Sequence, residues 1–75
     1  MKVVVYVGSW AQRYVEQPIV EVLLAEGSTI SDLLHLLPIP STEIGAILVG
    51  GLIVSHDYVL HKADTICIYP SLVDG

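Results

Sequence analysis

The stretch that decides the fold is residues 29–38, which read TISDLLHLLP. Thr29 is a favourable N-cap, and Asp32 completes a capping-box pattern that also suits the positive end of the helix dipole. Apolar residues then recur at the spacing of one helical stripe, and Pro38 ends the helix. The stripe consists of Ile30, Leu33, Leu34 and Leu37. So short a helix forms only when it packs on another surface, which predicts a sheet beneath it.

Segments with strand character lie on both sides of this helix. Two valine-rich segments precede it, and three apolar segments follow it. Gly50 and Gly51 separate the first of these three segments from the second. Two adjacent glycines favour a primed hairpin turn. The expected strands are residues 2–7, 19–25, 46–49, 52–54 and 65–69. The order β-β-α-β-β-β predicts an α+β roll, with one helix packed across one face of a four- to five-stranded sheet.

Two connections complete this prediction. Residues 41–45 are expected to form a turn, and the polar residues 55–64 are expected to contain a helical turn at residues 57–60. Residues 8–18 join the first two strands and carry Trp10, Arg13 and Tyr14. These three side chains have two interpretations: they cap the edge of the core, or they form a hot spot for a partner, where Trp, Tyr and Arg are enriched.

Side-chain alternation predicts that one face of the sheet stays uncovered. Period two places Val4 and Tyr6 on one face of the first strand and Cys67 and Tyr69 on the same side of the last strand. One helix covers only the opposite face. Because 53% of the 75 residues are hydrophobic, we expect this uncovered face to bind a partner, or a second copy of the chain when no partner is present.

Composition excludes several functions. Residues 1–75 are enough for one domain, and a net charge of −5 argues against nucleic-acid binding. No apolar run reaches the roughly 18–20 residues of a membrane span. The lone Cys67 forbids an internal disulfide and suits a reducing cytoplasm. The histidines at 35, 56 and 61 are scattered and expected to be exposed, so we predict no metal site, no cofactor and no enzyme centre.

The C-terminal segment, residues 66–75, reads ICIYPSLVDG. Pro70 cannot donate to a sheet ladder, so strand pairing is expected to end there. Residues 71–75 would then form a protruding tail that reaches roughly 17 Å when extended. A terminal glycine has no Cβ and fits a narrow site. This tail could therefore deliver a carboxylate to a partner's active site.

Three segments in this order resemble the ThiS/MoaD family of ubiquitin-like, β-grasp sulfur carriers. They are residues 26–34 (EGSTISDLL), residues 49–54 (VGGLIV) and residues 60–70 (LHKADTICIYP), followed by a C-terminal glycine. The resemblance implies a β-grasp roll with a mixed sheet. The Tyr69-Pro70 element and its distance from Gly75 are closest to the small subunit of molybdopterin synthase.

The resemblance also implies a function. An E1-like enzyme would adenylate the Gly75 carboxylate, and sulfur would then replace AMP to give a thiocarboxylate for molybdopterin (molybdenum or tungsten cofactor) biosynthesis. The large subunit of molybdopterin synthase would accept the tail, so this chain would be a co-substrate rather than an enzyme. The implied partner contacts are Val4, Tyr6, Tyr69, Pro70, Ser71, Leu72, Val73 and Asp74. The alternatives are a sulfur carrier for the thiamine pathway and a non-reactive β-grasp interaction module.

Three residues depart from the family pattern. Asp74 stands where the family has its penultimate glycine, and its charge would repel ATP phosphates. Ser71 stands where molybdopterin members often have a second proline. Ala63 replaces a turn glycine, at a cost of about 1 kcal/mol if that position needs a positive φ.

Overall fold

The computed structural model describes residues 1–72 and contains five strands, one α-helix and two 3₁₀ helices in this part of the chain. In chain order they are β1 (Lys2–Tyr6), η1 (Ser9–Ala11), β2 (Ile19–Leu23), α1 (Ile30–Leu36), η2 (Ser41–Glu43), β3 (Ile44–Val49), β4 (Leu52–Ile53) and β5 (Thr65–Pro70). None of the described helices is long and apolar enough to cross a membrane.

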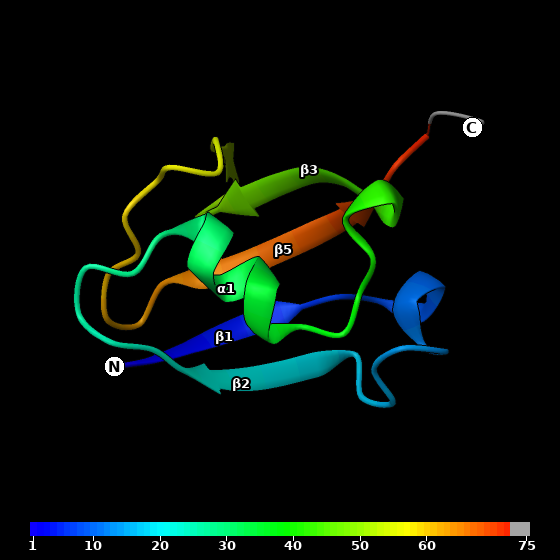
Figure 1. The fold of residues 1–75 in the computed structure, drawn as a ribbon, viewed down its shortest axis with the longest axis horizontal. Coiled ribbons are helices and arrows are strands. Elements are labelled where there is room, and N and C mark those ends of the chain that lie inside the picture. The colour runs from blue at the N-terminus through cyan, green and yellow to red at the C-terminus, as the bar shows by residue number, and fades with distance from the viewer. Residues whose placement is uncertain (73–75) are drawn as a thin grey trace.

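The strands form one mixed sheet in the order β2-β1-β5-β3-β4 (Figure 1). β1 and β5 are parallel neighbours at its centre, while β2 pairs antiparallel with β1 and β3 pairs antiparallel with β5 and β4. The predicted α+β roll is confirmed, and the sheet has five strands. The last strand therefore lies beside the first, which places the start of the C-terminal segment at the centre of the sheet.

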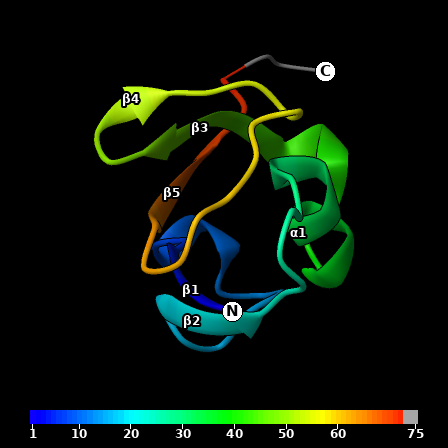
Figure 2. The same ribbon diagram turned by 90° about the vertical axis from the view of Figure 1, so that its left-hand side faces the viewer.

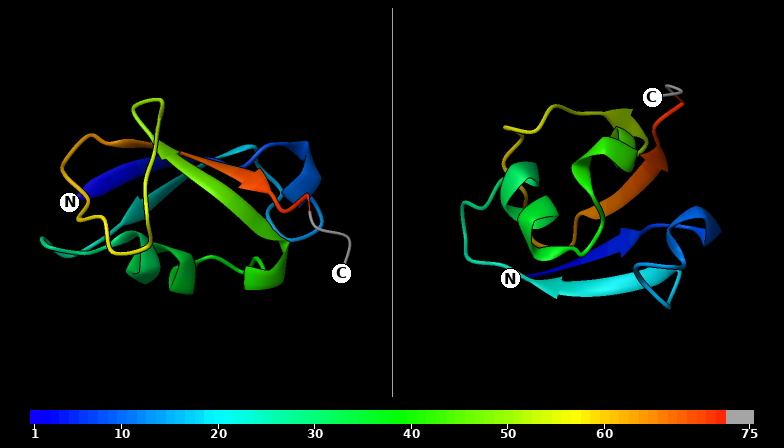
Figure 3. Two further views of the ribbon diagram at one scale, coloured as in Figure 1. Left: turned by 90° about the horizontal axis from the view of Figure 1, so that it is seen from above. Right: turned by 45° about the vertical axis from the view of Figure 1, so that its right-hand side comes forward.

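Helix α1 covers one face of the sheet and leaves the other face open (Figures 2 and 3). Its N-terminus has the predicted capping box: the Asp32 N–H donates to Thr29 Oγ1 over 3.3 Å, and the Thr29 N–H donates to Asp32 Oδ2 over 2.9 Å. Ile30 and Leu33 are fully buried beneath the helix. The predicted apolar stripe thus fixes which side of the helix meets the sheet.

The core lies between α1 and the covered face of β1 and β5. Val3, Val5 and Ile66 have no exposed surface, and Val5 pairs directly with Ile66 across the parallel strands. Ile68 follows on the same face and is also buried. The predicted alternation of β1 and β5 is therefore confirmed, and their covered residues make the centre of the core.

Two predicted connections are wrong. β3 begins at Ile44, so the last two residues of the expected turn 41–45 belong to the strand. The expected helical turn at residues 57–60 is instead a turn followed by an isolated antiparallel bridge between Thr29 and Val59. This bridge forms because Ile30 N–H donates to Tyr58 O over 3.0 Å and Leu60 N–H donates to Ser28 O over 2.8 Å. Leu60 is buried as a result, which a helical turn in a polar loop does not predict.

Ala63 has a φ of 70° and is the only described residue other than glycine with a positive φ. The left-handed conformation costs a residue with a Cβ about 1 kcal/mol relative to glycine. Ala63→Gly is therefore expected to raise the free energy of unfolding by about 1 kcal/mol in urea titrations. Ala46→Gly, the same change at an exposed position in β3, should instead lower it by about 0.5–1 kcal/mol. A loss of stability in both variants would contradict strain at residue 63.

Candidate functional site

The open face of the sheet presents the apolar side chains that alternation predicts. Tyr6 and Tyr69 are 43% and 51% exposed, whereas Val4 and Cys67 are half-buried among their neighbours. Tyr6 pairs with Cys67 across the parallel strands, so β1 and β5 contribute adjacent side chains to this face. The orientation of these four residues is confirmed, and their role as partner contacts stays a prediction.

At the C-terminal ends of β1 and β5 this face deepens into a groove of about 260 Å³, named here the aromatic groove. Trp10 from η1 and Pro18 from the same connection close the groove beside the strands. The residues that line it are Tyr6, Val7, Gly8, Trp10, Pro18, Cys67, Ile68 and Tyr69. Val4 lies on the same face but outside the groove. Pro18 was not predicted here, and it reaches the groove from beside the end of β1, where its carbonyl accepts from the Val7 N–H.

The connection that carries Trp10, Arg13 and Tyr14 serves both the core and the surface. Trp10 is half-buried, packs against the core and also lines the aromatic groove. Tyr14 packs against the core as well, and its hydroxyl donates to Glu43. The capping interpretation is therefore confirmed for Tyr14, while Trp10 also reaches the surface where a partner could bind.

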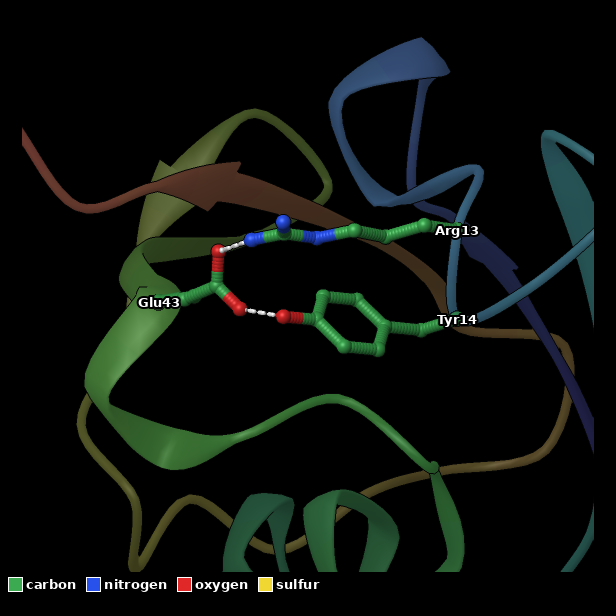
Figure 4. Close-up of polar contacts among 3 residues, drawn as sticks. All are labelled: Arg13, Tyr14 and Glu43. Carbon is green, nitrogen blue, oxygen red and sulfur yellow. Dashed lines mark hydrogen bonds and ion pairs between the residues drawn. The ribbon is translucent and has the colours of Figure 1, made fainter.

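Glu43 joins this connection to the far end of β5 (Figure 4). The guanidinium of Arg13 donates from Nη2 to Glu43 Oε1 over 2.6 Å, and the Tyr14 hydroxyl donates to Glu43 Oε2. The Arg13 guanidinium also lies 4.9 Å from the centre of the Tyr14 ring. Both carboxylate oxygens are thus engaged, which holds η2 against residues 13 and 14.

The backbone of the same region holds the end of β5. The Ser71 N–H donates to the Glu43 carbonyl over 2.9 Å, and Ile44 pairs with Pro70. The expected end of strand pairing at Pro70 is therefore confirmed, and the Ser71 N–H supplies the donor that proline lacks. A Cβ on Gly45 would lie 2.5 Å from the Pro70 oxygen, so only glycine allows this approach. We call Glu43, Gly45, Pro70 and Ser71 the tail junction.

Leu72 is the last described residue and follows the tail junction directly. Leu72 is 93% exposed, which leaves it available to a partner. Val73, Asp74 and Gly75, which belong to the predicted site, lie outside the described residues. Glu43 was not predicted, and nothing in the sequence indicates that it would meet both Arg13 and Ser71.

The three histidines and the Asp64 carboxylate are further polar groups of residues 1–72. His35, His56 and His61 are exposed, as predicted. Residues 1–72 contain no group of three or more His, Cys, Asp or Glu side chains that could hold a metal ion. The Asp64 carboxylate accepts from the His61 N–H over 2.8 Å and lies 3.5 Å from the Tyr58 hydroxyl. Partial burial and then this carboxylate raise the pKa of Tyr58 above its ordinary value. These contacts tie the 55–64 loop together.

Comparison with known families extends over most of the chain. Residues 11–74 match the model of a ubiquitin-like family described as Mut7-C ubiquitin. The chain belongs to the Mut7-C ubiquitin family. No curated protein matches it significantly. Membership of a ubiquitin-like family agrees with the β-grasp topology, and it confirms the expected relation to ubiquitin-like β-grasp proteins.

Solved structures show the same fold for this Mut7-C ubiquitin domain. SAMP1 from Haloferax volcanii superposes with a TM-score of 0.79 at 13% identity, covering 100% of both chains. A Pyrococcus furiosus protein described as molybdopterin converting factor subunit 1 superposes with a TM-score of 0.80 at 21% identity, covering 95% of this chain and 98% of that one. These similarities establish a ubiquitin-like β-grasp fold.

Proposed function

We propose that this domain is a non-catalytic sulfur carrier that acts through the carboxylate of Gly75 in molybdopterin biosynthesis. The observation that carries the proposal is the tail junction. It fixes the end of the central strand β5 through the Ser71–Glu43 hydrogen bond of 2.9 Å, and Leu72 follows at 93% exposure. A rigid exit of this kind sets the direction in which the last residues leave the domain, which reduces the entropy lost when they enter a partner's site.

The proposed chemistry belongs to the partners. In the active site of an E1-like enzyme, a Gly75 carboxylate oxygen attacks the α-phosphorus of ATP and pyrophosphate leaves. Hydrosulfide then attacks the acyl-adenylate carbon, AMP leaves, and a thiocarboxylate remains; with a persulfide donor the product is an acyl disulfide, and a thiol must reduce its S–S bond to release the thiocarboxylate. Adenylation is needed because a carboxylate is a poor electrophile. Because the reaction consumes ATP, the proposal includes a cytoplasmic location.

The open face suits docking to these partners. Tyr6, Tyr69 and the aromatic groove offer an apolar surface on β1 and β5, and β5 runs directly into the tail junction. A partner that covered this face would bury aromatic side chains, which dominate the binding energy of many interfaces. It would also receive the tail at a fixed position. The large subunit of molybdopterin synthase is the second proposed partner, and the description of the Pyrococcus furiosus neighbour supports that choice.

Intact-mass spectrometry tests the proposal directly. When the chain ending at Gly75 is incubated with its E1-like enzyme, ATP and a sulfur donor, we expect the mass gain of one oxygen-to-sulfur exchange. Deletion of Gly75 should abolish that gain, because the acyl group is then presented by Asp74. Asp74→Gly should increase the rate, since it removes a negative charge beside the site that receives ATP phosphates.

Ile53→Ala serves as the matched control, because Ile53 is 76% exposed on β4 and lies outside both the groove and the junction. It should be modified at the rate of the unchanged chain. An unaltered mass with an enzyme that activates another carrier would refute the proposal.

A second function, a non-reactive interaction module, is favoured by Asp74 together with the apolar open face. A module of this kind would bind its partner through Tyr6 and Tyr69 without chemistry at the tail. It differs from a carrier in one measurable respect. Deletion of Gly75 would leave the affinity for the partner and the cellular phenotype unchanged, whereas a carrier would lose its function.

A further inference from the structure

The outer edge of β2 is a second surface, separate from the open face and the tail junction. The sheet has two edges, formed by β2 and β4. β4 has only two residues, whereas β2 has five residues in unbroken register with β1, with neither proline nor bulge. Natural sheets protect an edge with prolines, bulges, very short strands or charged side chains. Of these devices β2 has only the charge of Glu21, so its edge is available for pairing with a strand of opposite charge.

The hydrogen bonds of β1 and β2 identify the groups on this edge. Leu24 N–H donates to Met1 O over 2.8 Å, and Val7 N–H donates to Pro18 O over 2.9 Å. In residues 18–24 the even-numbered residues thus bond to β1. Because antiparallel bonding alternates, the odd-numbered residues direct their N–H and C=O groups away from β1. These residues are Ile19, Glu21 and Leu23, and all three are exposed. They form a ladder of donors and acceptors that matches one added strand.

The charge along this edge indicates its occupant. Glu16, Glu21 and Glu26 are exposed before, within and after β2. Lys2 pairs with Glu21 over 2.9 Å, while Glu16 and Glu26 make no ion pair within residues 1–72. A second copy that paired antiparallel about Glu21 would place like charges opposite each other, which destabilises a sheet. A basic segment would meet opposite charges instead, and Leu23, which is 77% exposed, offers an apolar contact.

We propose that the outer edge of β2 binds an extended, basic segment of a partner protein, which adds a sixth strand to the five-stranded sheet. Main-chain hydrogen bonds to Ile19, Glu21 and Leu23 supply the affinity, and the three glutamates select a basic sequence. This binding does not depend on the chemistry of Gly75. It leaves the tail junction uncovered, so the domain can hold one protein at its edge while the tail engages another.

A capped synthetic peptide of alternating valine and lysine serves as the probe, titrated into the complete chain and followed by amide NMR. We expect shifts and slower hydrogen exchange at the amides of Ile19, Glu21 and Leu23, with an affinity that falls as salt rises. A peptide of the same sequence that is N-methylated at alternate residues cannot complete the ladder, and it should not bind.

Charge variants test the selection of a basic partner. Glu21→Lys is expected to weaken peptide binding about tenfold. Asp57→Lys makes the same change of charge in an exposed loop, and it should leave the affinity unchanged in 0.15 M salt, where screening acts over about 8 Å. The N-methylated peptide is tested on the unchanged chain, so it still tests main-chain pairing at β2 if Glu21→Lys fails to fold.

Three results would overturn the proposal: no binding of the unmodified peptide, equal binding of the N-methylated one, or amide shifts confined to the aromatic groove. Concentration-dependent shifts at β2 without peptide would assign the edge to a second copy and would also overturn it.

Discussion

Replacing Ile66 by alanine is expected to lower the free energy of unfolding by about 2–5 kcal/mol. Ile66 has no exposed surface, and it lies at the centre of the sheet between Val5 on β1 and Val49 on β3. Truncation removes buried methyl groups and leaves a cavity in the core between the sheet and α1. A domain of this size has a total stability of only about 4–11 kcal/mol. The variant should therefore lose a large fraction of its stability.

Urea unfolding followed by circular dichroism measures this loss, and Ile53→Ala is the matched control. It makes the same chemical change at a side chain that is 76% exposed. Its effect should stay within about 0.5 kcal/mol, as for most surface substitutions. Comparable losses in the two variants would contradict the placement of the core between α1 and the central strands.

The parts of the fold that follow from local pattern were predictable from the sequence. The capping box at Thr29 and Asp32, the helical stripe and the alternation of β1 and β5 depend on residues close together in the chain. The hairpin at Gly50 and Gly51 belongs with them, since both residues have the positive φ of a primed turn. The uncovered face was predictable because one helix can cover only one of the two faces of a sheet.

The parts that were missed depend on contacts between distant segments. Leu60 is buried because its N–H reaches Ser28, which turns a polar loop into a bridge. In the sequence Glu43 is an ordinary acidic residue of a turn, and only the fold brings Arg13, Tyr14 and Ser71 to it. The sequence predicts a turn that includes Gly45, whereas in the structure Gly45 belongs to β3. Its actual role is close approach to Pro70.

That close approach predicts the effect of Gly45→Ala. The added methyl would lie 2.5 Å from the Pro70 oxygen and 2.9 Å from its carbonyl carbon, which are backbone atoms that cannot rotate away. Either β3 or the end of β5 must move, at a cost of about 1–3 kcal/mol. The shift should break the Ser71–Glu43 hydrogen bond while the β1–β5 pairs near Ile66 survive.

Hydrogen exchange separates this local effect from general destabilisation. In Gly45→Ala we expect the Ser71 amide to lose its protection, while the amides of β1 and β5 near Val5 and Ile66 exchange more slowly than Ser71. Ala46→Val also enlarges a side chain of β3, but at an exposed position, and should leave Ser71 protected. If the tail junction directs the tail, Gly45→Ala should also slow sulfur loading more than a stability-matched core variant such as Ile68→Val. Equal loading of these two folded variants would show that the junction holds the strand without guiding the tail.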